Sequence, residues 1–237
     1  MDDTTSRGGL RSAFGLIAGA LFVIGPALAG LRLVPGLLGF VLFALGGLIG
    51  LVVGVVSVIQ ALRGRGLGRG GAIALGVGIV FFTLASRGFG VPRINDFTTD
   101  ASDPPAFTHA TTLPPNAARN MSYPPGFAEI QHTCCADLHP AHVRAGTGEA
   151  FARAERAARA MPSWEVVWTD PGSGLIEAVA TSRLFGFHDD IVIRVSPDSD
   201  GASRIDMRSK SRDGQGDFGV NAARIRAYMA ALKRRVT

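Results

Sequence analysis

Acidic residues are almost absent from the first 91 positions, where Asp2 and Asp3 are the only two. A helical surface in water carries charges of both signs, so this lack excludes a solvated helical domain. The seven arginines of the region lie between long apolar runs or at their ends: Arg7, Arg11, Arg32, Arg63, Arg65, Arg69 and Arg87. This distribution is typical of a region embedded in a membrane.

The rest of the chain has no excess charge of either sign. Residues 92–237 hold 17 basic and 17 acidic residues, so the whole formal net charge of +5 comes from the N-terminal region. Without a basic surface this part is unlike a nucleic-acid-binding domain, and we predict no nucleic-acid partner. Lysine is also scarce, with 2 lysines against 22 arginines, a composition typical of a GC-rich bacterium.

Three apolar runs are long enough for membrane spans, because a helix needs about 20 apolar residues to cross the hydrocarbon core. We predict a membrane domain over residues 1–91, with transmembrane helices at about 13–31, 36–62 and 70–87. Gly46 and Gly50 have the spacing that lets two helices pack closely. Glycine at these positions is either required for such packing or merely tolerated.

The arginines also predict orientation, because basic residues stay on the cytoplasmic side. Two precede the first span and three lie in the second loop, against one in the first loop. The N-terminus is therefore expected in the cytoplasm and the C-terminal region outside it, at the bacterial inner membrane. Alternatively, residues 1–29 are a signal peptide ending at Ala27-Leu28-Ala29, which leaves the C-terminal region on the same side.

Residues 92–143 contain eight prolines, which interrupt any long helix or strand. Spaced apolar side chains distinguish this stretch from a flexible linker: Ile94, Phe97, Phe107, Tyr123, Phe127 and Ile130. We predict an extended proline-rich strap over the soluble domain, with short strands near Ile94–Thr98 and Ala128–His132.

Residues 144–237 have the pattern of a compact α+β domain. A helix capped by Thr147 is expected to run to Met161. Four strands follow, at Trp164–Thr169, Leu175–Phe185, Asp190–Val195 and Arg204–Ser211. A last helix is expected from Asp217 to Arg235, with Phe218, Ile225, Tyr228, Met229 and Leu232 facing inward. Short loops favour antiparallel neighbours, so the prediction is a four-strand antiparallel meander with two covering helices.

Alternation along the strands sorts their side chains between two faces. The helix-facing set is apolar: Ile176, Ala178, Ala180, Ile191, Ile193, Val195, Ile205 and Met207. The opposite set is charged or polar: Glu177, Thr181, Arg183, Arg194, Asp206, Arg208, Lys210 and Arg212. Two interpretations are open: a solvated face with cross-strand charge pairs, or a polar binding surface roofed by the strap.

Several motifs carry a family resemblance. They are Phe185-Gly186-Phe187-His188-Asp189-Asp190, Arg208-Ser209-Lys210-Ser211-Arg212 and Asp217-Phe218-Gly219-Val220-Asn221 followed by Arg224-Ile225, with Ile94–Asp100 and Pro104–Phe107 upstream. From about Pro92 onward the chain resembles the domain-of-unknown-function 1499 family. The resemblance implies a bacterial or plastid domain, often preceded by membrane spans, with no agreed activity. Cys134-Cys135 departs from it, since an aromatic-proline pair is expected there.

The motifs define a candidate polar cluster: Asp189, Asp190, Arg194, Arg208, Ser209, Ser211, Arg212, Asp217, Asn221 and Arg224. We expect five of its members to be mutually hydrogen-bonded where the last strand meets the last helix: Asp190, Arg208, Arg212, Asp217 and Asn221. Such a network would lock loops together rather than perform catalysis. The alternative is an envelope enzyme that acts on an anionic or glycosidic substrate through these aspartates and arginines.

A metal centre is the weaker interpretation of a nearby set of thiols and imidazoles: His132, Cys134, Cys135, His139 and His142. The alternative is a pair of incidental thiols or a vicinal disulfide. The G-x-G-x-x-G sequence at Gly214–Gly219 lacks the further strand and acid of a dinucleotide site, so it predicts a tight turn capped by Asp217.

The sequence therefore predicts a polytopic membrane protein whose extracytoplasmic α+β domain has a binding or structural role at the cell envelope. The bilayer is its first partner, and an envelope protein or a small anionic ligand is the second. We predict no cofactor.

Overall fold

The computed structural model describes residues 3–234, with backbone only for residues 3–8 and 234. The chain forms two compact units. The first comprises the chain up to Phe89 together with the loop Arg183–Gly186, and the second comprises Gly90–Ser182 and the chain from Phe187 onward.

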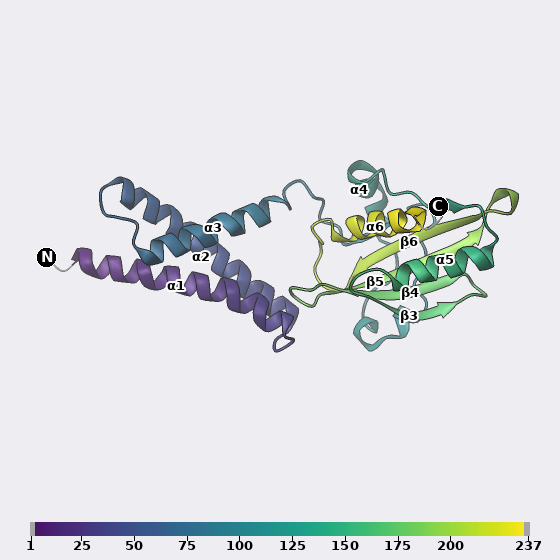
Figure 1. Cartoon of the computed structure of the whole chain (residues 1–237), viewed down its shortest axis with the longest axis horizontal. Coiled ribbons are helices and arrows are strands. Elements are labelled where there is room, and N and C mark those ends of the chain that lie inside the picture. Colours follow the sequence, from purple (N-terminus) through teal and green to yellow (C-terminus); the bar gives the residue numbers. More distant parts are fainter. Residues whose placement is uncertain (1–2, 235–237) are drawn as a thin grey trace. The chain divides into compact units, whose positions relative to one another are not determined.

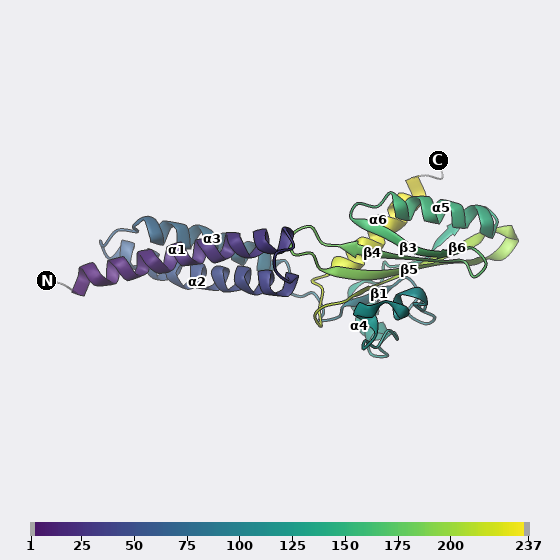
Figure 2. The same cartoon turned by 90° about the horizontal axis from the view of Figure 1, so that it is seen from below.

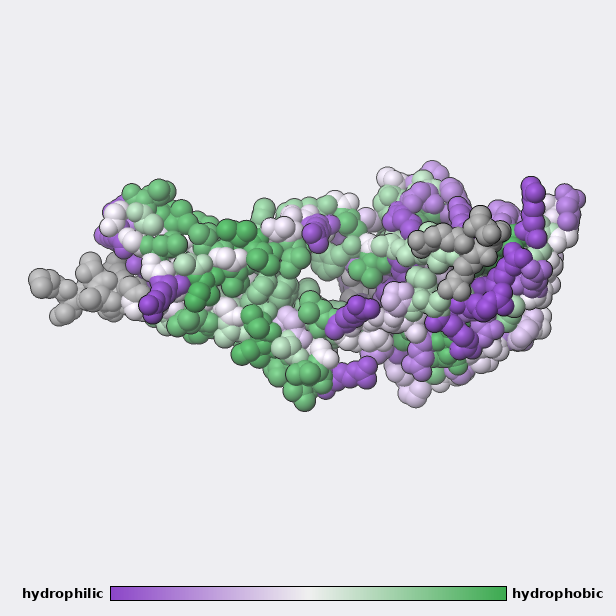
Figure 3. Space-filling model, viewed as in Figure 1, coloured by the Kyte–Doolittle hydropathy of each residue, from purple (hydrophilic) through white to green (hydrophobic). Residues whose placement is uncertain are grey.

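The first unit consists of three helices packed together: α1 (Asp3–Gly30), α2 (Gly36–Leu62) and α3 (Arg69–Ser86) (Figure 1). All three are long and apolar enough to cross a membrane, over Gly9–Gly30, Gly36–Leu62 and Arg69–Ser86. In Figure 3 most of their visible surface is hydrophobic. The predicted spans are therefore confirmed as long apolar helices.

The glycines of α2 are required for this packing. A Cβ atom on Gly46 would lie 2.5 Å from the backbone nitrogen of Phe22 in α1. On the other side of α2, a Cβ atom on Gly50 would lie 2.7 Å from Cγ1 of Val77 in α3. Both distances are too short for a real side chain. Small residues here let the three backbones approach closely, as in many helix pairs in lipid.

The second unit is an antiparallel sheet with helices. Its strands are β1 (Asp96–Thr98), β2 (Ala141–Val143), β3 (Trp164–Asp170), β4 (Leu175–Thr181), β5 (His188–Pro197) and β6 (Ser203–Ser211). The strand order is β1-β6-β5-β4-β3, and β2 also pairs with β6. The helices are α4 (Phe127–Cys134), α5 (Thr147–Arg159) and α6 (Val220–Arg234), and the 3-10 turns are η1 (His109–Thr112), η2 (Pro114–Asn116) and η3 (Ser199–Gly201).

Helices α5 and α6 cover one face of this sheet (Figure 2). The predicted apolar set of β4, β5 and β6 is buried there, in one cluster with Ile225, Tyr228 and Leu232 of α6. The Tyr228 hydroxyl donates a hydrogen bond to the Ala154 carbonyl of α5, at 3.0 Å. The expected α+β class and the two covering helices are confirmed.

Several details of the prediction were wrong. The strand expected at Leu175–Phe185 ends at Thr181, so Arg183 lies in the loop after β4 and not on the charged face. The sheet has about six strands rather than four, because the strap supplies β1 and β2. Ala128–His132 lies in helix α4, not in a strand. Thr147 is the first residue of α5 and makes no cap, since the N-cap residue is Gly146. Phe218 is exposed at a positive φ of 55° in the turn before α6, so it cannot face the core. The predicted helix end at Arg235 lies outside the described residues.

Candidate functional site

The strap covers the charged face of the sheet, opposite α5 and α6 (Figure 2). Phe107 and Ala110 of the strap are buried against Val192 of β5. Beneath the strap, Glu177, Asp190, Asp206, Arg208 and Lys210 are all buried. The interpretation as a solvated face is therefore wrong, and the roofed arrangement is the observed one.

Asp96 of β1 holds two cations of β6. Arg208 donates from Nε and Nη2 to the two Asp96 carboxylate oxygens, each at 2.8 Å. Lys210 donates to the same carboxylate at 2.9 Å. The Arg208 guanidinium also lies 4.8 Å from the Phe107 ring centroid and 5.4 Å from that of Tyr123. Strand pairing explains this geometry, because Asp96 is opposite Lys210 and Thr98 is opposite Arg208.

Asp190 of β5 is the centre of a second ion-pair group. Arg212 donates to Asp190 at 2.7 Å and Arg119 of the strap donates to it at 3.0 Å. Asn116 adds an amide hydrogen bond at 3.1 Å. Arg119 also donates to the Ser211 carbonyl at 2.5 Å. As in the first group, one buried carboxylate forms ion pairs with two cationic side chains.

Two further carboxylates anchor the strap. Glu177 accepts backbone hydrogen bonds from Thr108, His109 and Ala110 at 2.5, 3.0 and 2.6 Å, where η1 begins. Asp206 accepts from Arg204 at 2.9 Å. It also accepts from the hydroxyl of Thr99 at 3.1 Å and forms a 3.5 Å ion pair with Arg194.

The remaining candidates lie on the helix-covered face of the sheet. Asn221 of α6 accepts from the Ser209 hydroxyl at 2.6 Å and donates to the Ser211 hydroxyl at 2.8 Å. Arg224 forms an ion pair with Asp189 at 2.5 Å. The Asp217 carboxylate accepts from the backbone nitrogen of Asn221 at 2.6 Å, and burial raises its pKa above the usual aspartate value.

The ten candidate residues therefore form groups on two faces rather than one cluster. The expected five-residue network was wrong, because its members fall into separate groups. Asp190 is hydrogen-bonded to Arg212 and Asp217 to Asn221, whereas Arg208 is hydrogen-bonded to Asp96, which is not one of the five. The reason is the two-residue period of a strand, which sends neighbours such as Asp189 and Asp190 to opposite faces.

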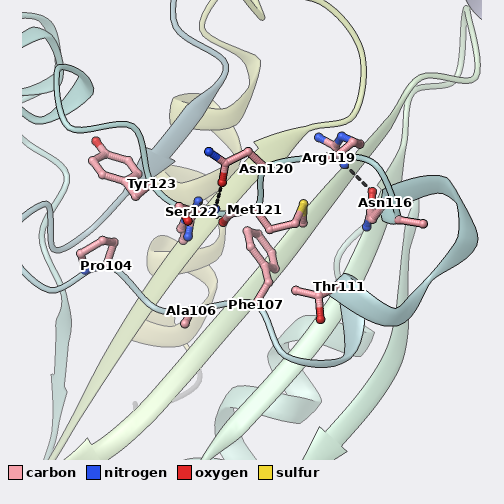
Figure 4. Close-up of a pocket in the computed structure, with 12 residues that line it drawn as sticks. Pro104, Ala106, Phe107, Thr111, Asn116, Arg119, Asn120, Met121, Ser122 and Tyr123 are labelled. Atoms are coloured by element: carbon pink, nitrogen blue, oxygen red, sulfur yellow. Dashed lines mark hydrogen bonds between the residues drawn. The ribbon is translucent and has the colours of Figure 1, made fainter.

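A pocket of about 450 Å³ opens in the strap (Figure 4). Arg208 and Arg119 line it, with Phe107, Met121 and Tyr123 supplying apolar surface. Polar groups join them from Thr111, Asn116, Asn120 and Ser122. Sequence reasoning missed Asp96, Asn116 and Arg119, because an irregular proline-rich stretch has no period that shows which side chains face the sheet.

The proposed metal ligands do not converge. Within residues 3–234 no group of three His, Cys, Asp or Glu residues could hold a metal ion. His142 pairs with Asp198 at 2.5 Å, whereas His132 and His139 are exposed. Cys134 and Cys135 are free thiols whose Sγ atoms lie 2.7 Å apart, and burial raises the pKa of the Cys134 thiol to about 12.

Comparison with known families adds one result. Residues 96–232, more than half of the chain, match the model of a family described as a protein of unknown function (DUF1499). The match begins at β1 and ends within α6, so it includes residues 96–143 of the strap and all six strands. A comparison with curated proteins gave no match.

Proposed function

The chain belongs to the DUF1499 family, and because that description assigns no activity, we propose a function from the geometry. The protein is anchored in the bacterial inner membrane by α1, α2 and α3, with its N-terminus in the cytoplasm. Its sheet unit lies outside the cytoplasm and binds a small anionic ligand in the strap pocket, as a binding component of the cell envelope.

The distribution of basic residues supports the orientation. Arg63, Arg65 and Arg69 lie at the end of the first unit that includes the start of the first span, and Arg32 and Arg87 lie at the other end. Including the arginines before the first span, the first end carries more positive charge. Basic residues stay in the cytoplasm during insertion.

The observation that carries the binding proposal is the local excess of cations at the pocket. Asp96 forms ion pairs with Arg208 and Lys210, and Asp190 forms ion pairs with Arg119 and Arg212. One carboxylate balances the charge of one cation, so each of the two groups has one positive charge in excess. Buried charge is costly without a partner of opposite sign. An anionic group in the pocket would supply that partner to the two arginines lining it.

The other acidic residues of the strap-covered face lie in groups apart from the pocket. The group around Asp206 has three carboxylates, with Asp100 and Asp103, against Arg194 and Arg204. Glu177 is satisfied by the three backbone N–H groups at η1. Charge on this face is therefore segregated, and the pocket is at its positive end.

The geometry gives less support to the envelope enzyme acting on an anionic or glycosidic substrate. That mechanism requires paired aspartates in one open cleft, as in glycoside hydrolysis. Asp189 and Asp190 point to opposite faces of the sheet, and Asp190 is fully buried between two arginines and an amide. Neither carboxylate reaches the pocket, whose lining is cationic, amidic and apolar.

Reporter fusions test the orientation. A phosphatase that is active only after export should be active when it is fused after the last residue. The same reporter should be silent when it is inserted between Arg63 and Arg69. The opposite pattern would contradict the proposed topology.

A matched pair of variants tests the pocket. Arg119 and Arg212 pair with the same carboxylate, but of the two only Arg119 lines the pocket. Urea denaturation of the full chain in detergent should show stabilisation by inorganic phosphate, relative to chloride at equal ionic strength, since a ligand bound to the folded state raises its stability. Arg119→Gln should abolish this stabilisation and Arg212→Gln should retain it. Equal responses in all three proteins would contradict a pocket site.

A further inference from the structure

The strap pocket is larger than a small inorganic anion requires. Its volume of about 450 Å³ is that of roughly 15 water molecules in the liquid. This volume lies within the range of pockets that hold whole organic ligands. An ion of the size of phosphate fills only a small part of the space, so the rest of the lining shows what else the ligand carries.

Few hydrogen-bond donors in the pocket are free to bind an anion. An arginine side chain has five N–H groups. Among the hydrogen bonds within residues 3–234, Arg208 donates four, to the Asp96 carboxylate and to two carbonyls of the strap. Arg119 donates three, to Asn116, to Asp190 and to one carbonyl of β6. The N–H groups that remain are mainly at Nε and Nη2 of Arg119, so an acidic group fits at that end of the pocket.

The middle and the other end of the pocket are largely apolar. In Figure 4, Phe107 and Met121 lie between Arg119 on one side and Tyr123 and Pro104 on the other. Met121 packs against the buried cluster that contains Phe107, so this wall is held in place by the strap. A ligand bound at Arg119 therefore extends along side chains that offer carbon and sulfur surface.

The polar groups beside this wall already have partners. The Arg208 guanidinium lies 4.8 Å from the Phe107 ring centroid and 5.4 Å from that of Tyr123, within the range of cation–π contacts. The Asn120 side-chain oxygen accepts a hydrogen bond from the Ser122 backbone nitrogen at 2.9 Å. Burial raises the pKa of the Tyr123 hydroxyl above the usual tyrosine value, so this ring stays neutral and does not repel an anion.

We propose that the ligand of the strap pocket is amphipathic, with a phosphate or carboxylate head at Arg119 and a short alkyl or aryl body against Phe107 and Met121. This inference rests on the proposed function, because it names the class of anion that the pocket binds. Burial of apolar surface supplies binding free energy that the few free donors do not. A polyhydroxylated body, as in a sugar phosphate, would lose hydrogen bonds to water at this wall without replacing them.

Phosphate monoesters test the body of the ligand separately from its head. Methyl, propyl and butyl phosphate share one head group, and their dissociation constants follow from the stabilisation of the full chain against urea in detergent. Each added methylene should tighten binding about two- to fourfold, as expected for partial to full burial. Glycerol 3-phosphate has the carbon chain of propyl phosphate with hydroxyls added, and it should bind more weakly. Butan-1-ol lacks the head group and should not stabilise the protein at the same concentrations.

A matched pair of variants tests the apolar wall. Met121→Gln keeps an unbranched side chain but makes it polar. It should lower the preference for butyl over methyl phosphate about twofold or more, and leave the affinity for methyl phosphate within about twofold. The control is Ile130→Gln, which replaces an exposed apolar side chain of α4 outside the pocket. This variant should keep the full preference, and equal loss in both variants would contradict the assigned wall.

The outcomes separate this inference from the proposed function. Equal affinity for methyl and butyl phosphate would overturn the amphipathic ligand and leave anion binding in place. Tighter binding of glycerol 3-phosphate than of propyl phosphate would do the same, since it assigns the pocket to a polar body. No stabilisation by phosphate or by any ester would overturn the proposed function as well. If Met121→Gln does not fold, the ester series on the wild type decides alone.

Discussion

Replacing Arg208 with alanine should destabilise the sheet unit strongly. The substitution removes two charge-assisted hydrogen bonds to Asp96 and leaves that fully buried carboxylate with Lys210 as its remaining cationic partner. It also removes the donors to the carbonyls of Pro105 and Met121. Breaking a buried ion pair costs about 3–5 kcal/mol. Because Lys210 stays in place, we expect a loss of about 3 kcal/mol in the free energy of unfolding.

The two tryptophans of the chain make this loss measurable in the intact protein. Trp164 and Trp168 both lie in β3, so their fluorescence during urea denaturation reports on the sheet and not on the membrane helices. Linear extrapolation to zero urea gives the free energy of unfolding for each variant.

The matched control is Arg226→Ala. Arg226 also makes two hydrogen bonds to one carboxylate, that of Asp137, but both side chains are largely exposed. Exposed pairs contribute about 0–1 kcal/mol, so this variant should stay close to the wild type. If Arg208→Ala loses no more stability than Arg226→Ala, the buried pair does not hold the strap to the sheet and the reasoning is refuted.

Three further outcomes are expected in the same assay or beside it. Glu177→Gln should lower the free energy of unfolding by about 1–3 kcal/mol, because three backbone N–H donors, of which that of Ala110 is buried, lose a charged acceptor, whereas exposed Glu165→Gln should change it little. Burial raises the pKa of Asp217, so folding favours its protonated form. Relative to Asp217→Asn, the wild type should therefore lose stability as the pH rises from below about 4 through the raised pKa. If the stability of the wild type relative to Asp217→Asn stays constant or increases over this pH range, the expectation is contradicted. Replacing Cys134 and Cys135 with serine should leave the zinc content unchanged, and stoichiometric zinc that disappears on substitution would restore the metal interpretation.

The long elements were predictable from the sequence because their signals are local. The apolar runs of α1, α2 and α3 and the alternation along β4, β5 and β6 are repeated over many residues. Short loops between β3, β4, β5 and β6 then leave an antiparallel arrangement as the simple solution. Phe218 was misplaced because a helical period was extended across Gly219, whose positive φ of 80° belongs to the turn before α6.

The strap and its pocket were not predictable, because their positions depend on pairs far apart in the sequence. β1 has three residues, and its place beside β6 depends on the pairing of Asp96 with Lys210. The partners of Arg208 come from the strap, more than 80 residues upstream. No local pattern marks Asp96 or Arg119 as a partner of a buried charge, so the charged face could be identified but not what covers it.

The central claim is that the strap pocket binds a small anion through Arg119. Its most direct test is mass spectrometry of the small molecules that co-purify with the full-length protein in detergent, compared for the wild type, Arg119→Gln and Arg212→Gln. We predict an anionic molecule with the wild type and with Arg212→Gln, and its loss with Arg119→Gln. The same molecules in equal amounts with all three proteins would contradict the claim.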